Sequence, residues 1–365
     1  GAYNWTYNTG ENTLITETRT FDPNNSYNYN AGATVNYTLF DGQGRNYRYL
    51  QAKGTHELSE LQLQITIQNT VLELSSIYHE VARMEESIAA LQKAVEISKE
   101  RFKRAEYGYE FGQAKQLDVL NATVDLNADS IALVTGIQQL ENLKRNLNFI
   151  MGQEIGQSIS VEKEVVLKNN LIEAEVLASA EQNNLQLRLA KNNQALSEYS
   201  IGASKSSWMP TLGANAGYQY RETEDPNGAF LIGAQNYVPQ ACLTLTWNFV
   251  NGSTNTQVKN AKLSLKNSQI EQQSLEQNVK SQAMNSYATY RNLLFVLKAQ
   301  TDNVATAEDN FKRSEESYKL GQINSVEFRQ AQLNLLNAEQ ALSKAKYDAK
   351  NAEFQVLSVM GSLVE

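Results

Sequence analysis

Several segments of the chain alternate between apolar and polar side chains with a period of two residues, which is typical of a β-strand whose two faces meet different surroundings. The clearest is SYNYNAGATVNYTLF, residues 26–40. Its apolar set contains Tyr27, Tyr29, Ala31, Ala33, Val35, Tyr37 and Leu39. Its polar set is uncharged and contains Asn28, Asn30, Gly32, Thr34, Asn36 and Thr38. Similar alternation begins at Ala2, Thr211 and Gln240, so the sequence predicts two pairs of strands.

Two kinds of β-sheet contain alternating strands of this kind. A soluble antiparallel sheet with one buried face alternates, and so does a membrane β-barrel with lipid outside and a lumen inside. A soluble sheet usually carries Lys and Glu on its wet face, whereas this polar face holds Asn, Thr, Gly and Gln. Tyr and Trp also gather toward the strand ends, as they do at membrane interfaces. We therefore favour the barrel, and because four strands cannot close around a lumen, several chains must contribute.

In a barrel, one face of each strand contacts lipid and the other lines the lumen. The side chains expected to face lipid are Tyr27, Tyr29, Val35, Tyr37, Leu39, Leu243, Leu245 and Trp247. Those expected to line the lumen are Asn28, Asn30, Thr34, Asn36 and Thr38. The lumen set is neutral, so we expect it to discriminate little among solutes.

Most of the remaining chain follows a helical pattern. A helix is predicted from about Asn46 to Glu106, which at 1.5 Å per residue is ~90 Å long. Its mostly apolar seam has the spacing of a coiled coil and contains Leu74, Ile77, Val81, Met84, Ile88, Leu91, Val95, Ser98 and Phe102. Further helices are predicted at about residues 116–151, 171–207 and 325–360. The narrow stripe fits both the wall of a hollow helical tube and a solvent-exposed coiled-coil hairpin, and periodicity alone does not separate the two.

The helical part is repeated. FKRAEYGYEFGQAKQLDVLNA at residues 102–122 matches FKRSEESYKLGQINSVEFRQA at residues 311–331, an offset of 209 residues. Each copy turns at a glycine, Gly112 or Gly321, which suits the left-handed position after a helix end. A helix at about residues 171–207 precedes the second strand pair, and we expect an equivalent helix upstream of Gly1 to complete the first copy.

We divide the chain accordingly. The expected segments are a first strand pair (1–40), a first helical hairpin (41–152), an equatorial connector (153–170), a helix leading to the barrel (171–208), a second strand pair (209–250), a second helical hairpin (251–361) and a C-terminal tail (362–365).

Composition and motifs exclude several classes of protein. The chain has 365 residues and a net charge of −8, which argues against binding of nucleic acid. The two histidines, His56 and His79, fit solvated or interhelical positions better than ligand positions, and Asp and Glu are scattered along the helices as solubilising charge. Neither a phosphate-binding loop nor a nucleophile elbow occurs. We therefore expect a protein that is not an enzyme and that holds no metal or cofactor.

The sequence resembles the TolC family of outer-membrane efflux ducts. The resemblance is carried by LFDGQGR at residues 39–45, PTL at 210–212, YEFGQAKQLDVLNA at 109–122 and YKLGQINSVEFRQA at 318–331. It implies a mainly α fold with a membrane β part, in which a homotrimer forms one twelve-stranded barrel in the outer membrane of a Gram-negative bacterium. The barrel would continue into a long periplasmic helical tube. The implied partners are outer-membrane lipid, a periplasmic adaptor and an inner-membrane pump, and the implied function is passive, gated conduction.

The resemblance also implies a gate at the helix turns, where carboxylates ring the entrance. The matching residues are Asp118, Glu327 and the turn aromatic Tyr318, with Gly112 and Gly321 in the turns themselves. The family often carries a second acid where this chain has Asn121 and Gln330, and a latching arginine where it has Ile323; Lys115, Lys319 and Arg329 lie nearby.

The gate carboxylates also have a structural explanation. Glu327 is the third residue of a predicted helix and can reach back to its start, as in a capping box. Asp118 lies in a first helical turn, where negative charge is favoured by the helix dipole. Capping has a slight advantage for Glu327, and the two roles are compatible.

The alternative function is a soluble coiled-coil scaffold or adaptor-like spacer with small β caps. It predicts solubility without detergent, whereas the duct predicts dependence on detergent. Alternation in all the strand segments, with aromatic residues toward the ends, favours the duct.

Overall fold

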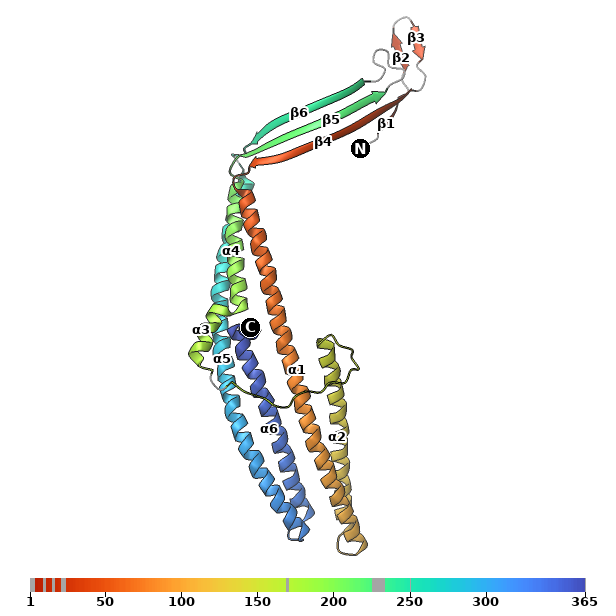
Figure 1. Ribbon diagram of the computed structural model, residues 1–365, viewed down its shortest axis with the longest axis vertical. Coiled ribbons are helices and arrows are strands. Elements are labelled where there is room, and N and C mark those ends of the chain that lie inside the picture. The colour runs from red at the N-terminus through yellow and green to blue at the C-terminus, as the bar shows by residue number, and fades with distance from the viewer. Residues whose placement is uncertain are drawn as a thin grey trace. The chain divides into compact units, whose positions relative to one another are not determined.

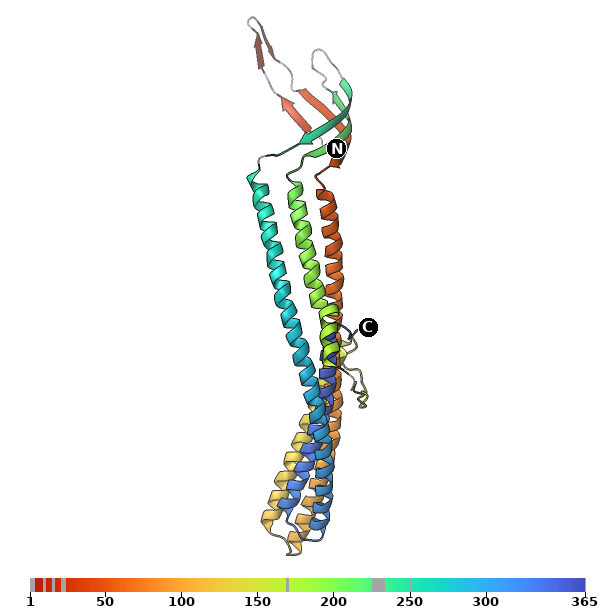
Figure 2. The same cartoon turned by 90° about the vertical axis from the view of Figure 1, so that its left-hand side faces the viewer.

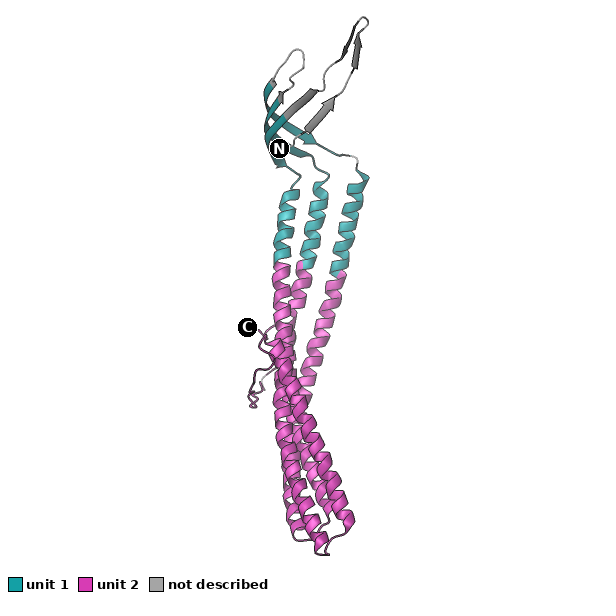
Figure 3. Ribbon diagram, turned by 90° about the vertical axis from the view of Figure 1, so that its right-hand side faces the viewer, with its two compact units in different colours: residues 1–56, 193–269 teal, residues 57–192, 270–365 magenta. Residues whose placement is uncertain are grey.

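The computed structural model of the chain is mainly helical with a small antiparallel sheet. It describes residues 4–8, 11–14, 17–20, 24–168, 171–224, 234–249 and 251–364, and it describes no side chain before Tyr29 or from Thr223 to Ala234. The chain divides into two compact units, residues 1–56 with 193–269 and residues 57–192 with 270–365 (Figure 3).

The first unit contains a four-stranded antiparallel sheet in the order β1-β4-β5-β6 (Figure 1). Its strands are β1 (Asn4–Asn8), β4 (Asn24–Phe40), β5 (Thr211–Glu224) and β6 (Ala234–Thr246). A separate hairpin is formed by β2 (Glu11–Leu14) and β3 (Glu17–Thr20). Both predicted strand pairs are therefore present, and the extra hairpin lies between the strands of the first pair.

The register of the sheet aligns the apolar sets of neighbouring strands. Val35 lies opposite Ala216, which lies opposite Ala241 on the next strand. Side chains directly opposite one another in antiparallel strands share a face. One face therefore carries Ala, Tyr and aliphatic residues, and the other carries Asn, Thr and Gly. Large apolar side chains of the first face, Val35, Tyr37, Leu243 and Leu245, are exposed on this chain.

The alternation of β4 ends at an irregularity in its pairing with β5. The register shifts between Thr38 and Phe40, so that Phe40 lies opposite Leu212 and Leu39 has no direct partner. Such a bulge re-aims the side chains at a strand end. Trp247 lies just beyond β6, and its indole nitrogen donates to the Trp208 carbonyl at 3.1 Å.

Most of the other predicted barrel residues lie on β4. Tyr29, Asn30, Thr34, Asn36 and Thr38 all have exposed side chains on this chain. The backbones of Tyr27 and Asn28 belong to the same strand, but their side chains lie outside the described residues.

The helices of the described chain form two antiparallel hairpins and a further pair. They are α1 (Gly44–Glu110), α2 (Gln116–Ile150), α3 (Glu173–Asn183), α4 (Leu185–Ser206), α5 (Gly252–Lys319) and α6 (Ser325–Met360). In the second unit α6 lies between α5 and α1, while α2 lies on the outer side of α1 (Figure 1). The predicted seam of α1 is buried from Val81 to Ser98 at its coiled-coil spacing. None of the helices in the described part of the chain combines the length and apolar character needed to cross a bilayer.

Both hairpins turn as the glycines predict. Gly112 and Gly321 have φ of 71° and 73°, a left-handed conformation that glycine adopts without strain. The amide of Gln113 donates to the Gly108 carbonyl at 2.6 Å, and that of Gln322 donates to the Ser317 carbonyl at 2.8 Å. These are the closing bonds of a helix C-terminus, so each long helix ends at a defined residue.

The helix predicted at residues 171–207 is instead two helices. The backbone leaves the helical conformation at Asn184, which has ψ of 123°. Its side-chain oxygen accepts from the amides of Gln186 and Leu187 at 3.0 and 3.2 Å, and its side-chain nitrogen donates to the Val359 carbonyl at 3.0 Å. Asn184 thus caps α4 and binds the end of α6, and these bonds stabilise the break.

The connector after α2 has neither helix nor strand in its described residues, yet it is fixed to the helices. Lys346 and Lys350 donate to the carbonyls of Lys163 and Val166 at 3.1 and 2.7 Å. The Tyr290 hydroxyl donates to the Lys168 carbonyl at 2.6 Å. Figures 1 and 2 show this segment crossing one side of the helix layer. It therefore ties α5 and α6 to the first hairpin.

Candidate gate at the helix turns

The predicted gate acids bind the starts of their own helices. The Asn324 amide donates to Glu327 Oε2 at 3.0 Å, and Asn324 Oδ1 accepts from the amides of Val326 and Glu327 at 3.0 and 2.9 Å. The Lys115 amide donates to Asp118 Oδ2 at 3.0 Å. The capping explanation of Glu327 is therefore confirmed, and its side chain remains exposed.

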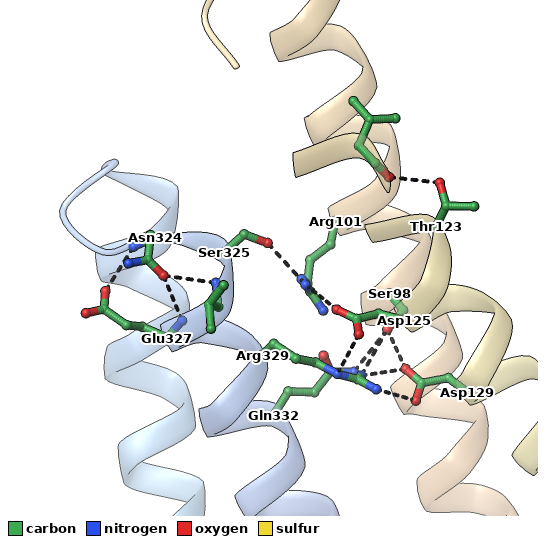
Figure 4. A network of polar contacts seen from close by, with 12 residues as sticks. Ser98, Arg101, Thr123, Asp125, Asp129, Asn324, Ser325, Glu327, Arg329 and Gln332 are labelled. Carbon is green, nitrogen blue, oxygen red and sulfur yellow. Dashed lines mark hydrogen bonds and ion pairs between the residues drawn. The ribbon is translucent and has the colours of Figure 1, made fainter. Parts of the chain in front are cut away.

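A buried network of charged residues lies close to these turns and joins the two hairpins (Figure 4). Arg329 on α6 donates to both oxygens of Asp129 on α2, at 2.6 and 2.8 Å. Ser98 on α1 donates to the same carboxylate at 2.5 Å. The Arg329 and Asp129 side chains are only 13% and 7% exposed. A paired arrangement of this kind has both geometric specificity and strength.

A second arginine extends the network. Arg101 on α1, with a side chain 3% exposed, donates to Asp125 Oδ2 at 2.8 Å and to the Ser325 hydroxyl at 3.1 Å. Arg329 Nε also lies 3.7 Å from Asp125 Oδ1. Two guanidinium groups thus face two carboxylates, so the buried charges compensate one another.

Charge pairing favours the charged form of Arg329. Burial opposes the charge of Arg329, but its hydrogen bond to Asp129 and the charges of Asp129 and Asp125 outweigh burial and raise its pKa. The network is therefore an ion-paired contact between α2 and α6, two elements separated by about 200 residues of chain.

The predicted turn aromatic takes part in a second contact between the hairpins. The Tyr318 ring stacks on Phe328 with centroids 4.7 Å apart and an interplanar angle of 6°. The Arg104 guanidinium of α1 lies over the Tyr318 ring, 4.9 Å from its centroid, and donates to the Lys319 carbonyl at 2.9 Å. Arg104 therefore connects the end of α1 with the end of α5.

A model of the family described as outer membrane efflux protein matches residues 2–153 and 176–362. The chain belongs to this family.

Relatives of known name agree with this membership. The chain is 24% identical over 328 residues to outer membrane protein TolC of Vibrio cholerae, covering 84% of this chain and 71% of that protein. It is 22% identical over 352 residues to TolC of Escherichia coli, covering 93% and 71%. The solved Campylobacter jejuni CmeC outer membrane channel superposes with a TM-score of 0.80 at 13% identity, covering 100% of this chain and 78% of that one.

These findings confirm the resemblance to the TolC family and the outer-membrane location of this efflux protein. The fold, mainly helical with a small antiparallel sheet, matches that of the channel structure. The family consists of transport proteins rather than enzymes.

The sequence alone did not identify most of the network of this efflux protein. Of its members, only Arg329 is placed near the turn from the sequence. The acids of the helices, Asp125 and Asp129 among them, are treated there as solubilising charge, and no role is assigned to Arg101. That reading was wrong for Asp129, and also for Glu353 on α6, which is fully buried and accepts from Lys350 at 2.9 Å and from the Lys168 amide at 3.1 Å. The available signal was the position of Asp129 in line with Ala122 and Gly136, on the side of α2 that is buried.

Proposed function

We propose that the protein is the outer-membrane exit duct of a tripartite efflux or secretion system. Small molecules or exported substrates would pass through it passively, from an inner-membrane pump and a periplasmic adaptor to the exterior. The strand segments within residues 1–40 and 209–250 would form the membrane part. The hairpins within 41–152 and 251–361 would form a periplasmic tube, with the connector at 153–170 around it.

The observation that carries this proposal is the exposed apolar face of the sheet. Val35 on β4 and Leu243 and Leu245 on β6 are 69%, 70% and 68% exposed on one face of the sheet, on either side of β5. A folded monomer rarely exposes a continuous patch of such residues to water. The tyrosines at one end of the sheet, with Tyr220 and Tyr237 ring centroids 5.1 Å apart, and Trp247 at the other end fit the two interfaces of a bilayer.

The edges of the sheet support assembly from several copies. In the described part of the chain, β6 pairs only with β5, and β1 pairs only with β4. Each neighbouring pair is antiparallel, so β1 and β6 run in opposite directions. The β6 strand of one copy can therefore add antiparallel to β1 of the next, and a homotrimer would close a twelve-stranded barrel. Lipid satisfies no backbone polar group, which makes closure a condition for insertion.

The turns of the hairpins would form the periplasmic gate. Opening requires α5 and α6 to shift against α1 and α2, and the ion pair of Arg329 with Asp129 resists that shift. In a homotrimer, symmetry would gather three copies each of Asp118 and Glu327 at the entrance, where they would form a ring of negative charge.

The same turns would receive the adaptor. The first turn exposes Tyr107 and Phe111, and the second exposes Leu320 and Val326. Exposed aromatic and aliphatic side chains at a loop favour a protein contact.

The test is the mass of the full-length gene product, extracted from membranes in detergent and measured by light scattering. A trimer that precipitates when detergent is withdrawn would support the duct. A monodisperse species that stays soluble without detergent would contradict it and would favour a coiled-coil scaffold with a small soluble sheet.

A further inference from the structure

The repeat gives each residue of the first hairpin a counterpart in the second. Helix α1 ends at Glu110 and α5 at Lys319, while α2 begins at Gln116 and α6 at Ser325. Both intervals equal the offset of 209 residues found in the sequence. The two hairpins can therefore be compared position by position.

Within one chain the two hairpins meet along α1 and α6, which are joined by hydrogen bonds such as Gln332 to the Ala94 carbonyl and Ser343 to Glu86. Near the turns this seam also includes the ion pair of Arg329 with Asp129 on α2 and the contact of Arg104 with Tyr318 on α5. By the repeat, the counterpart of this seam joins α5 to α2. Within one chain these two helices lie at opposite edges of the layer (Figure 1), so they can meet only between copies.

The counterpart seam lacks the buried charges. At the positions equivalent to Arg329, Asp129 and Arg101 the chain has Leu120, Ala338 and Asn310, and the counterpart of Ser98 is Ala307. A large apolar side chain thus replaces the arginine, and two small ones stand where its acceptors would be. A leucine opposite two alanines allows an apolar contact that needs no buried ion pair.

The surface of α2 is suited to such a seam. A row of apolar residues lies on the side of the helix away from α1, and the members Leu117, Leu120, Val124, Ile131 and Val134 are 61%, 56%, 66%, 67% and 67% exposed. Successive members are 3, 4, 7 and 3 residues apart, which matches the three-and-four spacing of a coiled-coil seam with one position passed over. The row therefore fits another helix along its length.

One contact of the seam within a chain has the same residue types, an arginine and a tyrosine, at its counterpart positions. Arg104 has Arg313 as its counterpart, and Tyr318 has Tyr109. The acceptor carbonyl of Lys319 corresponds to that of Glu110. Tyr109 is 49% exposed and Arg313 is exposed on this chain, so both are accessible to another copy. Arginine over a tyrosine face is favourable at such a position.

We propose that the apolar row of α2 packs against α5 of a second copy, with Arg313 over the ring of Tyr109 of the partner subunit. The inference rests on the proposed homotrimer and identifies its helical seam. It also separates two kinds of contact: the seam within a chain is ion-paired, and the seam between copies is apolar except for this one cation–π pair. Each α5–α6 hairpin then stays with α1 and α2 of the adjacent copy when the network of Arg329 breaks.

The test is site-directed crosslinking of the full chain in detergent. Arg313→Cys and Tyr109→Cys are combined with Cys242→Ser, and a short bismaleimide is added. We expect the monomer band on a denaturing gel to shift to dimer and trimer. The matched control combines Arg104→Cys and Tyr318→Cys, which lie in one chain, and its band should stay at the monomer position.

Light scattering of the same samples separates the possible failures. A trimer whose 109/313 pair crosslinks no better than either single-cysteine variant would overturn the inferred seam and leave the duct intact. A species that is not a trimer before substitution would overturn both the seam and the proposed function.

Discussion

Arg329 holds Asp129 through two hydrogen bonds, 2.6 and 2.8 Å long, across the boundary between the two helical hairpins. The pair lies where the hairpins must separate if the tube is to open. In the proposed duct this pair would act as a latch, since the position that the family resemblance assigns to a latching arginine is Ile323 in this chain.

Removal of the guanidinium should therefore open the gate. In Arg329→Gln the Asp129 carboxylate stays buried without its partner, and breaking a buried pair in this way costs about 3–5 kcal/mol. We expect a higher single-channel conductance in planar bilayers than that of the wild type. Arg145→Gln, which alters an exposed arginine on α2, is the control. Equal conductances for the two variants would exclude a latch at Arg329.

The stability of the helical unit should fall in acid because of His79. Its side chain is 7% exposed, and its Nδ1 lies 2.6 Å from Asn351 Oδ1. Burial is the main cause that lowers the pKa of His79 below 6.5, with Lys350 adding to this and the bond to Asn351 and the charge of Glu353 opposing it. The unfolded chain therefore binds the proton first, so the free energy of unfolding decreases as the pH falls below 6.5.

This dependence can be measured by denaturant unfolding followed by circular dichroism. His79→Gln keeps a polar side chain at the site but does not titrate, so its midpoint should vary less with pH between neutral and mildly acidic conditions. A variant with the same pH dependence as the wild type would show that other groups cause it.

Charge in the apolar row of α2 should prevent assembly. In Leu120→Asp a carboxylate would enter the inferred seam between copies, where burial without a partner costs several kcal/mol. We expect loss of the trimer by light scattering in detergent. Gln139→Asp introduces the same charge at an exposed position of α2 outside the row and should remain a trimer.

Replacement of Gly321 by alanine should destabilise the turn of the second hairpin. Gly321 has φ of 73°, and no atom lies within 4 Å of a β-carbon built there, so strain of the backbone alone opposes alanine. Gly321→Ala should lower the free energy of unfolding by about 1–2 kcal/mol. Gly156→Ala is the control, because that site is equally open and its φ is not left-handed. Equal unfolding midpoints would contradict the role of the turn.

The regular elements could be predicted because each follows a period in the sequence. Alternation identified β4, β5 and β6, and the coiled-coil seam identified the long helices. The break at Asn184 was missed because asparagine is tolerated inside helices, and its capping bonds become visible only when the end of α6 lies beside it. The bulge at Leu39 was missed because it depends on the partner strand.

The site was harder to predict than the fold. Asp125 and Asp129 look like ordinary surface acids of a polar helix, and their partner lies about 200 residues away in the chain. Comparison of the two repeats indicates these positions, but only once the structure shows which residues pair. Arg329 and Asp129 have uncharged counterparts, so charge at these positions marks the difference between the two seams.

The connector between α2 and α3 should be protected from hydrogen exchange and proteolysis, although it has no helix or strand in its described residues. The Glu162 amide donates to the Tyr78 hydroxyl at 2.7 Å, and the Lys168 amide donates to the fully buried Glu353 at 3.1 Å. Amide protons held in this way exchange with solvent only when the surrounding structure opens. These two amides should therefore exchange as slowly as those of the long helices. Proteases should cut the hairpin turns before they cut this connector.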